Sequence, residues 1–308
     1  MNPTQAHACA PEFDIPFRQV SGMPSMQAAL AGSGATVLFV LLWSSGAIFA
    51  EIGVQHVPAF AFLVGRFALA SFVLVGLGVW RGRWWPAPGT RWQVAGTGVL
   101  LTGGYAICYL LSLDRGLTPG LLATVLGVQP LLTLLATERA WSARRMAGLV
   151  LALGGLALVV GGASAQQVPM AGLSYALAAL ASMTVGAIWQ KRLGQAPIDV
   201  LPLQNAVSLV LCAGFLLAQP LPGAFVPSMP GIVALLSMGV VMSVGAQLLF
   251  YRLMQRGNLV NVTSLFYLVP VVTALLDDVV LGHRLSGVAM AGMGMILLGL
   301  AAVFRAQR

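Results

Sequence analysis

Long uncharged stretches separated by short charged segments run along most of the chain. The uncharged stretches cover residues 19–50, 92–113, 116–137, 146–190, 200–251, 257–276 and 285–304, and residues 52–80 contain one charge, Arg66. A membrane-spanning helix needs about 20 mostly apolar residues, so the two longest stretches must each hold two helices. Each has a glycine- and proline-containing turn, at 161–172 and 218–231. The pattern therefore predicts ten membrane helices, at 31–50, 59–80, 93–113, 118–137, 146–162, 170–190, 200–219, 230–254, 258–277 and 286–304.

The composition agrees with a membrane protein and excludes a soluble one. Of the 308 residues, 58% are hydrophobic and 8% are charged, and the mean hydropathy is +0.90. Soluble domains carry about 25% charged residues, and so few charges cannot cover a water-facing surface. The expected fold class is an all-α integral membrane protein. Residues 1–28 are polar and contain prolines, so we expect them to form a disordered cytoplasmic tail.

The basic residues indicate topology. The net charge is +8, but Lys and Arg are spread over short loops, which does not favour nucleic-acid binding. Cytoplasmic loops of membrane proteins are enriched in Lys and Arg. With the N-terminus inside, 13 of the 16 basic residues lie on the cytoplasmic side, namely Arg18, Arg81, Arg83, Arg91, Arg139, Arg144, Arg145, Lys191, Arg192, Arg252, Arg256, Arg305 and Arg308. Both termini are therefore expected in the cytoplasm.

The two halves of the chain are related at an offset of 140 residues. The run "VLGVQPLLTLL" at 125–135 and the run "LFYLVPVVTAL" at 265–275 each contain a proline followed three residues later by a threonine. At the same offset Glu138 falls on Asp278, and small residues recur in the next helix, at Gly148, Ala152 and Gly155 and at Gly287, Ala291 and Gly294. Two five-helix halves, at 29–165 and 166–308, would enter the membrane in opposite senses. Such inverted repeats are typical of secondary transporters.

Polar side chains inside the expected spans are candidates for substrate binding, because a polar group in lipid is costly unless it has a partner. The alternative for each is a hydrogen bond between helices. Tyrosine and tryptophan combine apolar faces with a polar tip, which suits an amphipathic, zwitterionic or uncharged solute such as an amino acid better than a phosphate. The candidates are Trp43, Tyr105, Tyr109, Gln129, Trp189, Gln247, Tyr251, Ser264 and Tyr267.

The expected spans also contain two prolines and one arginine with possible special roles. Pro130 and Pro270 would kink their helices and free the carbonyls of Leu126 and Phe266, so both are expected to serve as gates. Arg66 is expected to form a structural ion pair with Glu51, which ends the first helix on the same side. Snorkelling of Arg66 to the interface and a direct substrate role are the alternatives. Cys9, Cys108 and Cys212 lack metal-ligand spacing, so no metal site is expected.

Several segments in order resemble the drug/metabolite transporter superfamily, and in particular its EamA-type ten-helix members. They are "VLLWSSGAIFAEIGV", "PAFAFLVGRFALA", "GLTPGLLATVLGVQPLLTLLA", "AIWQKRLG" and "LLFYRLMQRGNLVNVTSLFYLVPVVTALL", within residues 30–304. The resemblance implies two inverted five-helix repeats, a central cavity lined by helices 1, 3, 4, 6, 8 and 9, export of small metabolites, often amino acids, and no bound cofactor. The chain departs from the family pattern in "ALLDDVVLGHRLSG", where Asp277 and Asp278 replace apolar residues and His283 replaces a glutamate. These acids are either solvated or coupled to protons.

The resulting hypothesis is an inner-membrane exporter of a small metabolite that works by alternating access. An uptake carrier and an uncoupled facilitator remain alternatives, as do a membrane enzyme and a scaffold outside transport. The chain has no concentrated set of acids, bases or nucleophiles at membrane depth and no P-loop, so neither catalysis nor ATP-driven pumping is expected. The expected partners are a small solute and the bilayer. Protons as a coupling ion, and a monomeric or homodimeric state, stay open.

Overall fold

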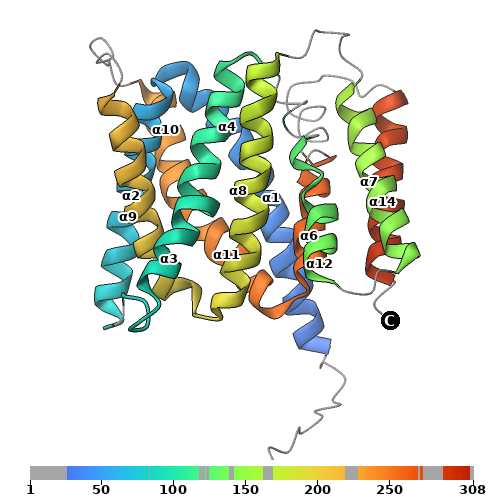
Figure 1. Ribbon diagram of the computed structural model, residues 1–308, viewed down its shortest axis with the longest axis horizontal. Helices are drawn as coiled ribbons and strands as arrows, with labels where there is room; N and C mark the ends of the chain where they lie inside the picture. Colours follow the sequence, from blue (N-terminus) through green and yellow to red (C-terminus); the bar gives the residue numbers. More distant parts are fainter. Residues whose placement is uncertain are drawn as a thin grey trace, which may run out of the picture.

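The computed structural model describes residues 26–305 except 83, 118–121, 123–124, 139–141, 162–168, 219–227, 270 and 273–286. Regular secondary structure within these residues is entirely helical, and the helices stand side by side with their axes roughly parallel (Figure 1). Most of the tail expected at 1–28 lies outside the described residues, and α1 begins at Met26. The turns near 161–172 and 218–231 lie largely outside them as well.

The first half contains α1 (Met26–His56), α2 (Ala59–Trp80), α3 (Arg91–Thr97), η1 (Gly98–Gly104), α4 (Tyr105–Asp114), α6 (Gln129–Thr137) and α7 (Ala143–Gly161). The second half contains α8 (Met170–Leu193), α9 (Pro197–Leu217), α10 (Met229–Leu236), η2 (Ser237–Ala246), α11 (Gln247–Arg256), α12 (Leu259–Ser264), η3 (Leu265–Tyr267) and α14 (Gly287–Arg305). The stretches η1 and η2 are π-helical turns within longer helices, whereas η3 is a short 3₁₀ turn.

Five described segments are long and apolar enough to cross a membrane. They are Ala59–Trp80, Arg91–Asp114, Met170–Leu193, Pro197–Leu217 and Met229–Arg256. Each overlaps one of the helices expected from the uncharged stretches. Shorter apolar segments occupy Gly34–Ala50 in α1 and Met290–Arg305 in α14. The protein is therefore an all-helical membrane protein with several spans.

The ends of the helices follow from local backbone chemistry. Pro197 occupies the first position of α9, where a missing N–H leaves no intrahelical bond unmade. Gly194 ends α8 with a φ of +63°, a left-handed conformation that a side chain would disfavour. At the start of α12, the Asn258 side chain accepts a hydrogen bond 2.9 Å long from the Val260 backbone N–H. These residues fix where each helix leaves the membrane.

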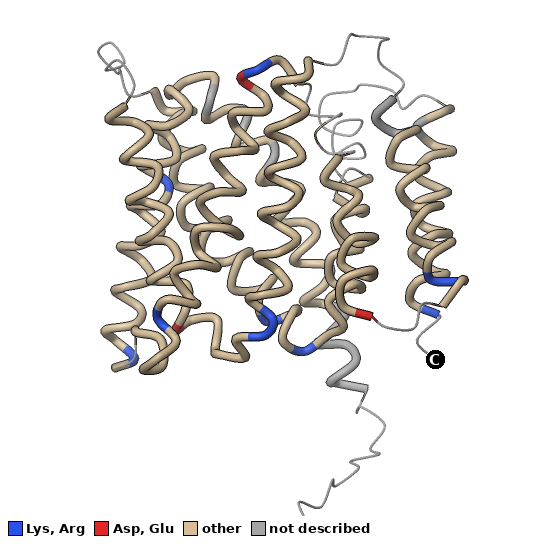
Figure 2. Tube along the Cα trace, in the orientation of Figure 1, with Lys and Arg blue, Asp and Glu red and all other residues tan. Residues whose placement is uncertain are grey.

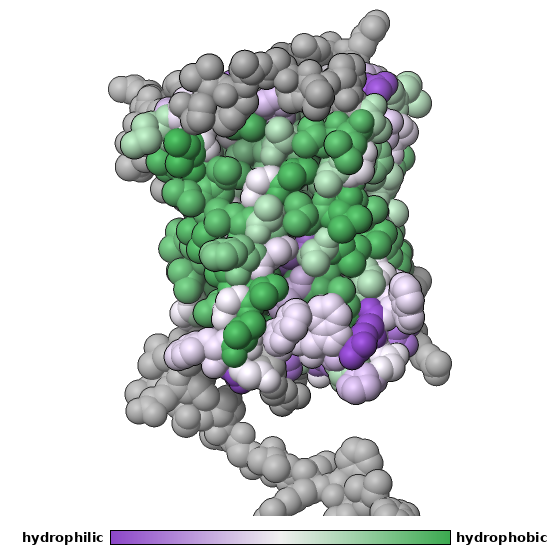
Figure 3. All heavy atoms as spheres, turned by 90° about the vertical axis from the view of Figure 1, so that its left-hand side faces the viewer, coloured by the Kyte–Doolittle hydropathy of each residue, from purple (hydrophilic) through white to green (hydrophobic). Residues whose placement is uncertain are grey.

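The outer surface of the bundle is apolar at mid-height. On the face shown in Figure 3, a broad hydrophobic belt lies above a more polar lower end. Lys and Arg gather at the end where α14 terminates (Figure 2), and we call this end the basic end. It holds Arg81, Arg91, Arg144, Arg145, Lys191, Arg192, Arg252, Arg256 and Arg305. Trp80 and Trp92, which flank the loop between α2 and α3, are 85% and 88% exposed, as expected for aromatic side chains at a membrane–water interface.

Glycines allow α7 and α14 to pack backbone to backbone. A Cβ atom on Gly148 would lie 2.7 Å from the Gly299 carbonyl oxygen, and one on Gly155 would lie 2.5 Å from the Gly292 carbonyl oxygen. Small residues permit such contact between membrane helices. The small-residue face expected in the first half is thus used for packing. The prediction for the second half was wrong, because a Cβ atom on Gly287 or Gly294 would have no neighbour within 4 Å. The face of α14 that packs on α7 contains Gly292 and Gly299 instead.

The helices of the two halves pack against each other in matched pairs. α2 packs on α9, α6 packs on α12, and α7 packs on α14. α1 packs on α10 and η2, and α8 packs on the corresponding segments α3 and η1. In these last two interfaces, Gly46 faces the Met242 side chain and Gly186 faces the Leu101 backbone. Each helix pair therefore recurs between the halves at corresponding sequence positions.

Candidate functional site

A chain of hydrogen bonds crosses the interior of the bundle. The Gln204 side chain, fully buried on α9, donates through Nε2 to Thr97 Oγ1 and to Gln190 Oε1, both at 2.6 Å. Its Oε1 accepts a 2.9 Å bond from the Tyr251 hydroxyl. Four helical segments, α3, α8, α9 and α11, are tied together by this one amide. The sequence analysis missed Gln204, because nothing in the uncharged stretch 200–251 indicates in which direction this amide points.

Gln247 extends this hydrogen-bond chain. Its Nε2 donates to Thr102 Oγ1 at 3.1 Å and to the Tyr251 hydroxyl at 3.3 Å. Gln247 and Tyr251 were expected to bind substrate; in the conformation described, Gln247 Nε2 and the Tyr251 hydroxyl form hydrogen bonds to other helical segments. Buried networks whose members are paired rigidify a core. The arrangement therefore makes these two residues a structural cross-link in the conformation described.

Aromatic side chains form a second interior group. Phe39 and Trp43 on α1 contact Phe250 on α11 and Phe266 on η3, with ring centroids between 5.1 and 5.6 Å apart. Phe39 and Phe250 stack, whereas Trp43 meets Phe266 edge to face. Trp43 is half-buried. The group supplies a broad apolar surface shared by both halves.

Arg66 lies among α2, α9, η2 and α4. Its Nε atom donates to Ser243 Oγ at 2.7 Å, and its guanidinium lies 5.4 Å from the centroid of the Phe67 ring. Ser243 itself donates to the Met238 carbonyl, five residues earlier, so the π-helical turn of η2 directs this serine toward Arg66. The structure does not describe the side chain of Glu51. The ion pair expected between Glu51 and Arg66 therefore stays a prediction.

The remaining candidates fall into different settings. Tyr105 and Tyr109 on α4 are half-buried neighbours with ring centroids 5.8 Å apart. Trp189 packs across Gly96 of α3, where a Cβ would come within 2.5 Å of the indole. Ser264 is fully buried and donates to the Val260 carbonyl. Gln129 is buried too, and its Nε2 atom has no hydrogen-bond partner within the described part of the chain.

The helix that contains Pro130 is interrupted just before the proline. Residues 127–128 form a turn, and α6 starts at Gln129 with Pro130 in its first turn. The Gly127 carbonyl oxygen accepts a hydrogen bond 2.6 Å long from the Tyr267 hydroxyl, which is completely buried. We expected the freed carbonyl at Leu126, whereas the bond between the halves forms one residue later. Pro270 and Thr273, and also Asp277, Asp278 and His283, lie outside the described residues.

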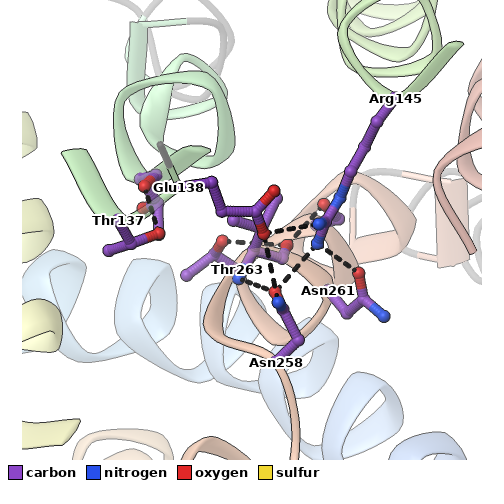
Figure 4. A network of polar contacts seen from close by, with 9 residues as sticks. Thr137, Glu138, Arg145, Asn258, Asn261 and Thr263 are labelled. Carbon is purple, nitrogen blue, oxygen red and sulfur yellow. Dashed lines mark hydrogen bonds and ion pairs between the residues drawn. The ribbon is translucent and has the colours of Figure 1, made fainter. Parts of the chain in front are cut away.

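A polar cluster joins the two halves at the basic end. Figure 4 shows Arg145 reaching from α7 toward Glu138, Asn258 and Asn261. Arg145 forms an ion pair with Glu138 through Nη1, and through Nη2 it donates to Asn258 Oδ1 at 2.8 Å and to Asn261 Oδ1 at 2.9 Å. Asn258 Nδ2 donates in turn to Glu138 at 3.1 Å. Arg145 is only 5% exposed, so the cluster seals the space between α6, α7 and α12.

Metal chemistry finds no support in the part of the chain that the structure describes. No group of three His, Cys, Asp or Glu side chains converges there, and Cys108 and Cys212 are both free thiols.

An apolar belt around a helical bundle with buried polar side chains defines a multi-pass helical membrane protein. The chain belongs to the EamA-like transporter family, which matches residues 30–161 and again residues 170–305. The resemblance to the drug/metabolite transporter superfamily is thereby confirmed, and the two matches correspond to two family repeats. The protein is a transporter and not an enzyme.

Two relatives illustrate this assignment. A probable amino-acid metabolite efflux pump of Salmonella typhimurium is 27% identical over 283 residues, which cover 86% of this chain and 91% of that protein. A protein of known crystal structure is similar with a TM-score of 0.75 and 22% sequence identity, over 90% of this chain and 99% of that one. The second likeness concerns the fold alone.

Proposed function

We propose that the protein exports a small metabolite, an amino acid or a similar amphipathic solute, across the cell inner membrane by alternating access. The observation that carries this proposal is the matched packing of the two halves. Alternating access requires two halves that rearrange around a central site, and repeats with opposite insertion provide them. The amino-acid class draws on the curated relative, whose name refers to amino-acid metabolites.

The Tyr267–Gly127 hydrogen bond supports an inverted repeat of ten helices, with halves at 29–165 and 166–308. The two residues are 140 positions apart, which equals the offset between the halves. Equivalent positions of two repeats can touch only near the axis that relates them. The self-pairing of α2 with α9, α6 with α12 and α7 with α14 agrees with such an axis. The π-helical turns η1 and η2 also overlap at this offset.

The polar cluster of Glu138, Arg145, Asn258 and Asn261 is proposed as the cytoplasmic gate, closed in the conformation described. Cytoplasmic ends of membrane proteins are rich in Lys and Arg, so the basic end is assigned to the cytoplasm together with both termini. The cluster connects the segment between α6 and α7 with the start of α12, one element from each half. Solute would enter from the cytoplasm when these contacts open. Pro130 and Pro270 are proposed as the bending points of the gates.

The solute site is proposed above this gate, among the side chains that stay half-buried. Trp43, Tyr105, Tyr109 and Trp189 offer aromatic faces, and the tyrosines add hydroxyl groups. In this proposal Gln247, Tyr251 and Ser264 hold the helices around the site, since their polar atoms are already bonded. Gln129 and Tyr267 border it beside the interruption at Pro130.

Reconstitution into liposomes tests the function. Purified full-length protein would be incubated with a panel of radiolabelled amino acids and related metabolites, with and without a pH gradient. We expect transport of at least one amino acid. Transport of none would remove the amino-acid assignment. A rate indifferent to the pH gradient would favour the uncoupled facilitator over a proton-coupled exporter, and accumulation only in the inward direction would favour uptake.

A further inference from the structure

Arg66 is a cation within a membrane span, and the described side chains that it contacts are neutral. A charged side chain at membrane depth is costly and usually pairs with an opposite charge or marks a functional pathway. Among the described residues, the ion pairs join Arg115 to Asp114 and Arg145 to Glu138, and neither involves Arg66. Ser243 and the Phe67 ring are neutral neighbours. Among the side chains that the structure describes, which do not include that of Glu51, Arg66 therefore has no counter-charge.

The donors of Arg66 are only partly used. An arginine side chain carries five N–H donors, and Ser243 accepts the one on Nε. The two Nη groups have no hydrogen-bond partner among the described residues. Arg145 provides the contrast, since both of its Nη groups are engaged by Glu138, Asn258 and Asn261. The free edge of Arg66 is a planar pair of donors, which matches the two oxygens of a carboxylate.

The neighbours of this free edge suit an amphipathic anion. The Tyr105 hydroxyl and the Cys212 thiol lie within electrostatic range of the guanidinium. Tyr105 and Tyr109 stand beside each other, and within the described structure neither hydroxyl forms a hydrogen bond. They can therefore donate to a bound anion while their rings face its apolar part. Ser243 fixes the guanidinium through Nε and so presets its direction.

We infer that Arg66, held by Ser243 and with Tyr105 nearby, binds the carboxylate of the transported solute. One guanidinium is enough for a monocarboxylate, whereas a phosphate calls for several basic groups. The other described Lys and Arg residues lie near helix ends, away from this position. The inference rests on the proposed transport function and narrows its substrate to solutes with a carboxylate group.

The first test compares acids with their amides. L-Leucine and L-phenylalanine, and their amides, would compete for transport by the wild type, Arg66→Gln and the control Arg115→Gln in proteoliposomes. Charged hydrogen bonds of this kind correspond to a preference of about tenfold or more for the acid. We expect the wild type and Arg115→Gln to show that preference and Arg66→Gln to lose it through a higher KM. Unchanged KM and preference in Arg66→Gln would overturn the inference.

The second test needs no variant and covers the case in which Arg66→Gln fails to fold. Wild-type protein would react with phenylglyoxal, an arginine reagent, and peptide mass spectrometry would follow Arg66 and Arg115. We expect L-leucine and L-phenylalanine to slow modification of Arg66 about tenfold, for the same energetic reason, and their amides to have no effect. Arg115 should react equally in all samples.

The outcomes separate this inference from the proposed function. Amino acids that are transported without protecting Arg66 would overturn the inference and leave the transport function standing. Protection of Arg66 by the acids without any transport would uphold the carboxylate site and contradict the function. Equal protection by acids and amides would overturn carboxylate recognition, since the amides carry no anion.

Discussion

Neutralising Glu138 should weaken the proposed cytoplasmic gate. In Glu138→Gln the side chain keeps its shape and an acceptor oxygen, but Arg145 loses its counter-charge. Hydrogen bonds to charged groups contribute about 1.5–3 kcal/mol, against roughly 0.5–1.5 kcal/mol for neutral ones. The Arg145 and Glu138 side chains are only 6% and 20% exposed, so solvent screens the pair little. The closed conformation should therefore lose about 1–2 kcal/mol, which raises the open fraction by roughly tenfold.

Thiol labelling would measure this change. The native cysteines would be replaced by serine, and Ser264→Cys would serve as reporter, because Ser264 is fully buried on α12 just beyond Asn261. A membrane-impermeant thiol reagent would be added to inside-out vesicles, so that it reaches the basic end. Glu138→Gln should increase the labelling rate of the reporter about tenfold, provided that the closed state predominates.

Asp199→Asn is the matched control. Asp199 lies in the first turn of α9 and forms no ion pair within the described structure, so its neutralisation should leave the labelling rate unchanged. A reporter rate in Glu138→Gln equal to that of the unmodified background would refute the gate. An equal increase in Asp199→Asn would show that general loss of charge, rather than this cluster, controls access.

Three substitutions probe the packing and hydrogen bonds that hold the bundle together, and thermal unfolding in detergent measures each. Gly155→Leu would force α7 away from the Gly292 carbonyl, and overpacking of this kind costs about 1–3 kcal/mol. Tyr267→Phe would leave the buried Gly127 carbonyl without its donor, at a cost of roughly 1–3 kcal/mol. Gln204→Leu would remove three buried hydrogen bonds at once and should lower the melting temperature most.

Each substitution has a control on the same kind of residue. Gly154→Leu adds the same side chain where the nearest atom to a Cβ is 3.5 Å away and belongs to the flexible Met295. Tyr175→Phe removes a hydroxyl that makes no hydrogen bond to the described residues, and Gln93→Leu changes an exposed amide of α3. A control that melts as low as its partner variant would show that the named contact is not the cause.

The positions of the helices could be predicted because lipid excludes charge. The apolar stretch after Pro58, in which Arg66 is the one charge, predicted a helix at 59–80, and α2 has these same bounds. At Pro130 a kink within one helix at 118–137 was expected, whereas the structure has a turn at 127–128 and a new helix that begins at Gln129. Two family repeats were visible from the matched prolines and their common offset. These features depend on local chemistry and on length, which the sequence displays directly.

The contacts between helices could not be predicted in the same way. Every face of these helices is apolar, so hydrophobic periodicity does not distinguish lipid-facing from interior positions. For this reason Gly287 and Gly294 were expected on the packing face of α14, which the structure shows to hold Gly292 and Gly299 instead. The π-helical turn that aims Ser243 at Arg66 likewise has no single-residue signature. Asn258 could be expected near a helix start. Its hydrogen bond to Glu138 could not, because Glu138 belongs to the first half of the chain and only the folded structure brings the two together.

Solute counterflow tests alternating access most directly. Proteoliposomes would be loaded with an unlabelled amino acid that the protein transports, diluted, and supplied outside with a trace of the same amino acid carrying a radiolabel. A protein that exposes one site to each side in turn should accumulate the label transiently above equilibrium, because the internal solute speeds the return of the site to the outside. Entry of the label at a rate independent of the internal amino acid, with no transient accumulation, would contradict alternating access and indicate an open pathway.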